Sequence, residues 1–256
     1  GAFAAIMANF YTHSILISLL AAMCASMVVA WIAGIFMVKF KGAMLVVGVS
    51  INVLMAGLTT FLMQIIFGVK GAFVSNKLVG LTKVNVDVLH SDLLKTMFGS
   101  LTYLDLFAFV LAVALYFFLF RTVTGFRMRS VGLNKPAAES LGIKADRLQI
   151  GTVVFSGLLS GIGGCLLTMG GVTMFAQNIT AGRGFIAMAA GTLGAAHPLG
   201  VVISSAFFGF AQSMANMLQN SNISSQLTMA LPYVATVVAL ALYNFVQMKR
   251  GNAPRQ

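Results

Sequence analysis

The chain has 256 residues, 59% of them hydrophobic and 8% charged, and its mean hydropathy is +0.95. A soluble core of this size cannot bury so much apolar surface, which excludes an ordinary soluble protein and indicates one membrane domain over residues 1–256. The net charge of +11 comes from residues in short gaps between apolar runs, which indicates membrane topology and argues against nucleic-acid binding.

The uncharged runs predict an all-α transmembrane bundle with about seven membrane segments. We expect them at 14–38, 42–69, 97–120, 148–182, 185–196, 201–218 and 224–246. The twelve residues of 185–196 would give about 18 Å of helix, whereas the hydrocarbon layer is about 30 Å thick, so this crossing should be short or broken. Because the chain opens with Gly1 in apolar sequence, we expect preceding helices to be missing.

The basic residues predict which side of the membrane each gap faces. Lys39 and Lys41, the six basic residues within 121–147, and the basic C-terminus all fall on one side of a seven-pass count. That side should be the cytoplasm. The opposite side receives the loop 70–95, whose lysines are offset by acids, and the turn that carries Arg183. The C-terminus should therefore be cytoplasmic.

Residues 121–149 form a polar segment with helix start and stop signals of its own. Asn134 can cap a helix, Pro136 suits a first turn, and Gly142 can end the helix with Ile143 folding back. The pattern predicts a helix of two turns outside the bilayer. Composition alone also permits an ordinary solvated connector.

Two stretches carry a family resemblance. Residues 124–143 read TGFRMRSVGLNKPAAESLGI, which resembles the cytoplasmic coupling segment of ABC importer permeases, although Lys135 stands where many relatives go directly from Asn to Pro. Residues 181–191 read AGRGFIAMAAG and are followed by HPLG, which is similar to the nucleoside branch of that family. Permeases for simple sugars and branched-chain amino acids are its nearest relatives and remain alternatives.

The resemblance implies a permease subunit that works with other proteins. The chain has no phosphate-binding loop for ATP, so we expect no cofactor here and ATP with Mg²⁺ on a separate ABC ATPase. It further implies a second permease, identical or different, an extracytoplasmic substrate-binding protein, and membrane lipid as partners. Coupling to the ATPase is expected from Gly125, Arg127, Arg129, Gly132, Asn134, Pro136, Ala137, Ala138, Glu139 and Gly142. In this view the alanines permit close approach, Glu139 pairs with a basic partner, and the arginines anchor the segment near anionic lipid or the ATPase.

The solute path is expected to be lined by uncharged hydrogen-bonding groups and by small residues of the short segment. The candidates are Asn52, Gln64, Ser156, Ser160, Ala190 and Gly191. Polar groups in a membrane equally bond to neighbouring helices, and the short segment equally packs against a partner permease. The glycines from Gly157 to Gly171 favour close helix packing over a flexible, path-lining helix.

The remaining chemical groups support no other site. Asp105 is interpreted as an acid near the outer end of its helix, in preference to a proton relay. Cys24 and Cys165 are expected to be packing residues, and the scattered histidines lack metal-ligand spacing, so we predict no metal site. A secondary transporter or channel would need more intramembrane charge, and an enzyme would need a convergent catalytic set.

Overall fold

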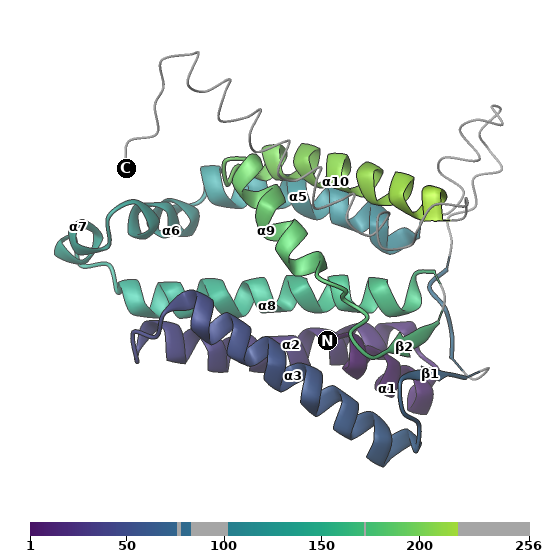
Figure 1. The fold of residues 1–256 in the computed structure, drawn as a ribbon. Coiled ribbons are helices and arrows are strands. Elements are labelled where there is room, and N and C mark those ends of the chain that lie inside the picture. Colours follow the sequence, from purple (N-terminus) through teal and green to yellow (C-terminus); the bar gives the residue numbers. More distant parts are fainter. Residues whose placement is uncertain (76–77, 83–101, 172, 220–256) are drawn as a thin grey trace, which may run out of the picture. The chain divides into compact units, whose positions relative to one another are not determined.

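The computed structural model describes residues 1–75, 78–82, 102–171 and 173–219, and these are mostly helical (Figure 1). They fall into two compact units, which we treat separately. The first contains Gly1–Phe109 and Phe118–Thr180, and the second contains Val110–Phe117 and the described part of Ala181–Gln256.

Five helices of the described chain are long and apolar enough to cross a membrane. They are α2 (Ile15–Val38), α3 (Met44–Phe67), α5 (Tyr103–Arg121), α8 (Ala145–Met169) and α10 (Pro198–Gln219). A multi-pass helical chain is therefore confirmed. The predicted count of seven stays a prediction, because the segment 224–246 and the C-terminus lie outside the described residues.

Helices α2 and α8 pack closely and run antiparallel. A Cβ added at Gly34 would lie 3.5 Å from the Ile150 side chain, and one at Gly161 would lie 2.6 Å from the Ala22 carbonyl oxygen. At Gly157, an added Cβ would overlap Ala30. The glycines of α8 thus let two backbones approach, which is the packing interpretation of this pattern.

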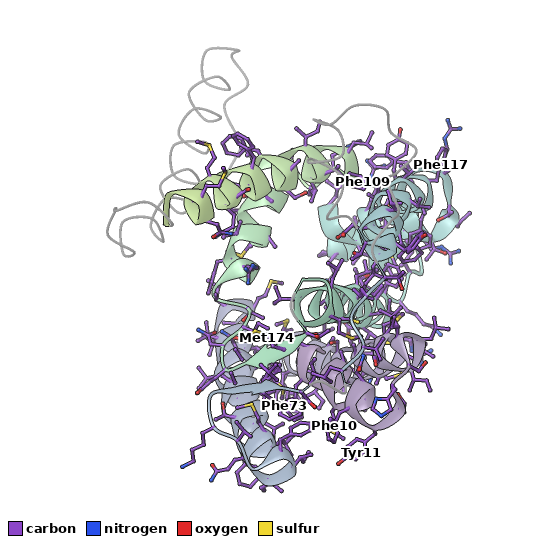
Figure 2. All side chains as sticks on the ribbon, turned by 90° about the vertical axis from the view of Figure 1, so that its right-hand side faces the viewer. Phe10, Tyr11, Phe73, Phe109, Phe117 and Met174 are labelled. Carbon is purple, nitrogen blue, oxygen red and sulfur yellow. The ribbon has the colours of Figure 1, made fainter. Side chains whose placement is uncertain are left out.

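Helix α1 (Ala2–Thr12) packs with α2 and α8, and its side chains Phe3 and Phe10 contact two short strands. The strands β1 (Ala72–Val74) and β2 (Met174–Ala176) pair antiparallel, with Phe73 opposite Phe175. Figure 2 shows Phe10 of α1 beside Phe73, with Met174 on the neighbouring strand. Since β1 follows α3 and β2 follows α8, the C-terminal ends of both helices lie at one end of this unit.

The side chain of Asn9 ties α1 to the segment after β1. Its amide donates to the Val79 carbonyl oxygen at 2.9 Å, and its oxygen accepts from the Val79 N–H at 2.9 Å. Asn9 is fully buried. A buried polar side chain costs free energy unless it is bonded, so this pair of bonds fixes the position of α1.

The uncharged run 148–182 is not one helical segment, contrary to its sequence pattern. Helix α8 begins three residues earlier than this run and ends at Met169, and the chain then forms β2. Beyond β2, Asn178 and Ala181 both have left-handed backbone angles (φ 58° and 41°), which a continuous α-helix cannot contain.

Helix α5 begins with a cap that explains its acidic residue. The Asp105 carboxylate accepts from the Thr102 N–H at 2.8 Å and from the Thr102 hydroxyl at 2.6 Å. Asp105 lies in the first turn, where a carboxylate is favoured by the free N–H groups and the helix dipole. This agrees with the interpretation of Asp105 as a helix-end acid.

In the second unit, α9 (Arg183–Leu193) packs against α10. Eleven residues give about 17 Å of helix, well short of a bilayer core, as the sequence predicts. The turn to α10 is tight, because a Cβ at Gly194 would lie 2.6 Å from the Gly200 carbonyl carbon. Ala195 and Ala196 there have positive φ angles of 52° and 54°.

Candidate functional site

The polar segment 121–149 starts with a sharp turn from α5 into a separate helix, α6 (Val123–Leu133). The Thr122 hydroxyl accepts from the Gly125 N–H at 3.1 Å and donates to the Phe118 carbonyl oxygen at 2.6 Å. A Cβ at Gly125 would lie 2.6 Å from the Leu119 Cα. Glycine at position 125 is therefore required by the close approach of two backbones. Sequence reasoning missed α6 as a helix.

Asn134 serves two helices at once. Its N–H donates to the Ser130 carbonyl oxygen at 3.0 Å and closes α6, while its side-chain oxygen accepts from the Ala137 N–H at 3.1 Å and opens α7 (Lys135–Ser140). Pro136 lies in the first turn of α7, where a missing N–H costs nothing. The start of α7 is thus as the sequence predicts, although its six residues make less than two turns.

The end of α7 is also as predicted. Gly142 has φ 79°, its N–H donates to the Glu139 carbonyl oxygen at 2.9 Å, and the Ile143 N–H donates to the Ala138 carbonyl oxygen at 3.2 Å. These two bonds form a Schellman cap, in which the left-handed residue is usually glycine. The cap turns the chain directly toward α8.

Ala138 lies in a small apolar core that holds α7 against its neighbours. Its side chain is 2% exposed and packs with Val131 of α6 and Ala145 of α8, and Ile143 covers the cluster. Ala138 therefore offers almost no surface to a partner. Its small size serves packing within the chain, whereas the neighbouring Ala137 is exposed.

An ion pair adds a second link between α7 and α8. The Lys135 ammonium lies 2.6 Å from the Asp146 carboxylate, and this hydrogen bond raises the pKa of Lys135 above its ordinary value. Because the pKa of Lys135 is raised, the ion pair contributes to the stability of the folded segment at neutral pH. This contribution is lost only as the pH rises through the raised pKa. Both side chains are exposed, so the pair positions α7 more than it stabilises the fold.

The outward side chains of this segment are mixed in character. Glu139 is exposed on α7, and Leu133 and Leu141 on either side of it are 86% and 80% exposed. Arg127 and Gly132 are also exposed. The Arg129 guanidinium lies 4.3 Å from the centre of the Phe120 ring, a cation–π contact that ties α6 to the end of α5.

The segment lies at the opposite end of the first unit from the strand pair, because α7 precedes α8 and β2 follows it (Figure 1). At this end, Lys39 and Lys41 from the α2–α3 turn line a cavity of about 640 Å³ together with Lys135, Glu139 and Asp146. Two groups of basic residues that are distant in sequence thus meet at one end.

The expected path residues are divided between the two units. Asn52 and Gln64 of α3 and Ser156 and Ser160 of α8 are exposed in the first unit. In the second unit Ala190 of α9 is buried, and a Cβ at Gly191 would meet no described atom within 4 Å. Within the described part of the chain Gly191 therefore has open space beside it, whereas Ala190 is enclosed.

Comparison with known proteins identifies the family. Residues 1–241 match the model for the branched-chain amino acid transport system permease component. The guanosine ABC transporter permease protein NupQ of Bacillus subtilis is 32% identical over 271 residues, covering 100% of this chain and 82% of that protein. The nucleoside ABC transporter permease protein NupC of Lactococcus lactis is 31% identical, covering 80% of this chain and 66% of that protein.

A third relative is less similar in sequence. A putative glucose ABC transporter permease, TsgC13 of Haloferax volcanii, is 23% identical over 84% of this chain and 71% of that protein. No solved structure matches the chain. With a family model that spans almost all of its residues and with its apolar helices, the chain belongs to the ABC transporter permease family and is a multi-pass membrane protein.

Proposed function

We propose that this chain forms the membrane path of an ATP-driven importer for nucleosides. The observation that supports the solute most strongly is the 32% identity, over the whole chain, to a guanosine permease. A nucleoside is polar and uncharged, and the candidate path groups, among them Asn52 and Ser156, are uncharged hydrogen-bonding groups. Simple sugars are the second candidate, because the glucose permease relative is 23% identical.

The proposal assigns energy coupling to α7. A helix transmits the closure of an ATPase only if it moves as one body with the membrane helices. Caps at both ends, the buried Ala138 and the Lys135–Asp146 pair all hold α7 on α6 and α8. The exposed Glu139 and Ala137 face outward from this rigid support and are the proposed contacts.

The proposed complex has three other components. A separate ABC ATPase binds ATP and Mg²⁺, a second permease completes the membrane path, and an extracytoplasmic binding protein delivers the solute. In this arrangement the chain itself is no enzyme. The end that carries α7 faces the cytoplasm of the bacterial inner membrane, consistent with its basic residues.

The solute is tested by transport. The chain is reconstituted with its ATPase, second permease and binding protein, and uptake of radiolabelled guanosine is compared with that of glucose and leucine. We expect ATP-dependent guanosine uptake that exceeds uptake of either competitor by at least tenfold. Preferred uptake of glucose or leucine contradicts the nucleoside assignment, and uptake driven by an ion gradient without the ATPase contradicts the importer class.

The coupling role is tested with Glu139→Arg. Reversal of this exposed charge should abolish uptake and solute-stimulated ATP hydrolysis, while membrane insertion and yield stay normal. Glu139→Asp keeps the charge and is the matched control, with uptake near that of the unaltered protein. Undiminished uptake by Glu139→Arg rejects α7 as the coupling helix.

A further inference from the structure

A second cavity beside α7 carries charge of one sign only. It has a volume of about 470 Å³ and is lined by Arg127 of α6, by Lys144 and Arg147 at the start of α8, and by the apolar Leu141, Ile143 and Leu148. The size falls within the usual range of small-molecule sites, about 300–1,000 Å³. Three cations beside apolar side chains suit an amphiphilic anion.

These three cations lack neutralising partners in the part of the chain that is described. Arg127, Lys144 and Arg147 are exposed, and the ion pair found at this end of the unit joins Lys135 to Asp146 instead. Glu139, the other acid of the segment, lines the neighbouring cavity with Asp146, and both acids share a smaller cavity of about 340 Å³ with Lys144 and Arg147 without forming an ion pair to either among the described residues. Like charges held together repel one another, so binding an external anion here is favourable.

The length of α8 places this cavity at the membrane surface. Its 25 residues make about 37 Å of helix, which exceeds the hydrocarbon thickness of about 30 Å by roughly two turns at most. The charged residues of α8, Asp146 and Arg147, both lie in its first turn, followed by Gln149. The start of α8 therefore lies at the depth of lipid headgroups.

Helix α6 presents an apolar surface beside the same cavity. Val123, Phe126 and Leu133 are 69%, 68% and 86% exposed, and their spacing of three and then seven residues puts them on one side of the helix. Arg127 follows Phe126 directly. Apolar residues such as Val131 also lie on the buried side of α6, so the helix as a whole is not amphipathic, but its exposed stripe is available for contact with lipid at the membrane surface.

We infer that Arg127, Lys144 and Arg147 bind the phosphate headgroup of an anionic phospholipid. Arginine binds phosphate oxygens through paired N–H groups, Lys144 adds a second positive charge, and Leu141 and Leu148 contact the adjoining glycerol and acyl carbons. The start of α8 at headgroup depth favours lipid over a soluble ATPase as the occupant. The site depends on neither the solute nor coupling through α7.

The test measures lipid selectivity in reconstituted membranes. The full chain is placed in phosphatidylcholine bilayers with trace spin-labelled phosphatidylglycerol or phosphatidylcholine, and the motionally restricted fraction gives a relative association constant. We expect a preference for phosphatidylglycerol that falls about fivefold for each cation removed. Lys144→Gln/Arg147→Gln should lose it, and Lys39→Gln/Lys41→Gln, which removes the same charge at the same end, should keep it.

Additional variants and competitors distinguish a lipid site from misfolding, from a site for free anions and from a protein-docking surface. Lys144→Arg/Arg147→Lys keeps the charge and should keep the preference, which shows that loss in the glutamine variant reflects charge and not misfolding. Equal association of both lipids, or equal loss in the Lys39/Lys41 control, overturns the site.

Competitors identify other occupants. If soluble glycerol phosphate displaces the labelled lipid more than chloride does at equal ionic strength, the site binds a free anion. If adding the ATPase abolishes the lipid preference, the site is a protein-docking surface. Either result overturns the proposal.

Discussion

At the scale of single residues, the structure distinguishes two neighbours in the segment 121–149 that look equivalent in sequence. Ala137 and Ala138 both suit close approach to a partner, yet Ala137 is exposed and Ala138 is 2% exposed within the chain. Helix geometry explains the difference, because adjacent residues point about 100° apart around the axis. The sequence predicts the helix, but the side on which it packs depends on Val131 and Ala145.

This contrast gives a matched pair of variants. Ala138→Leu should overfill the core formed with Val131 and Ala145 and destabilise the segment by about 1–3 kcal/mol, whereas Ala137→Leu should leave it intact. Trypsin cleavage within 121–147, which carries six basic residues, measures local opening, and only Ala138→Leu should accelerate it. Equal cleavage of both variants would show that α7 is not held by this core.

Two glycines of α8 provide a second matched pair of variants. Gly161 faces the backbone of α2, where an added Cβ would lie 2.6 Å from the Ala22 carbonyl oxygen, whereas a Cβ at Gly163 meets no described atom within 4 Å. Gly161→Leu should therefore separate the helices, and Gly163→Leu should be tolerated. In a Cys24→Ser background, maleimide labelling of the buried Cys165 should increase for Gly161→Leu alone. Protection of Cys165 in both variants would contradict the packing interpretation.

At the scale of elements, hydrophobic runs predict α2 and α3 to within two residues at each end, because lipid imposes a length and an absence of charge that are visible in sequence. The caps of α7 are predictable for a similar reason, since Asn134 and Gly142 act locally. Helix α6 and the strands were missed. Gly125 and Gly132 obscure the helical signal of α6, and the three-residue strands exist only through pairing that is distant in sequence.

Substitutions in the short helix α9 test whether this element borders the solute path. Gly191 has open space beside it among the described residues, and Ala190 is buried. If α9 borders the solute path, Gly191→Leu should block uptake while assembly with the ATPase and basal ATP hydrolysis persist, and Ala190→Leu should instead reduce the yield of folded protein. Normal uptake by Gly191→Leu, or failure only through lost assembly, would make α9 a packing element.

At the scale of the whole molecule, the two ends of the first unit differ in chemistry. Basic residues from the α2–α3 turn, α6, α7 and the start of α8 gather at one end, and the strand pair with its aromatic side chains lies at the other. Charge asymmetry along the sequence predicts such a division. It does not reveal that two strands join the loops that follow α3 and α8.

Cysteine labelling tests the orientation of these ends. Ser130→Cys on α6 should react with a membrane-impermeant maleimide only from the cytoplasm, and Ser75→Cys, just after β1, only from outside. The physical reason is that the reagent cannot cross the bilayer and the two positions lie at opposite ends of α8. Reaction of both variants from the same side would overturn the topology.

The strand pair also constrains the order in which the chain can mature during synthesis. Ala72 pairs with Ala176, about a hundred residues later, and Asn9 bonds to Val79. Ribosomes add about 5–20 residues per second, so β1 waits at least several seconds for its partner. Until β2 emerges, the amide edge of β1 has no partner strand, although Phe73 can already contact Phe10 and Phe67. The newly made protein is therefore most exposed to misassociation and quality-control proteases while its C-terminal half is being translated.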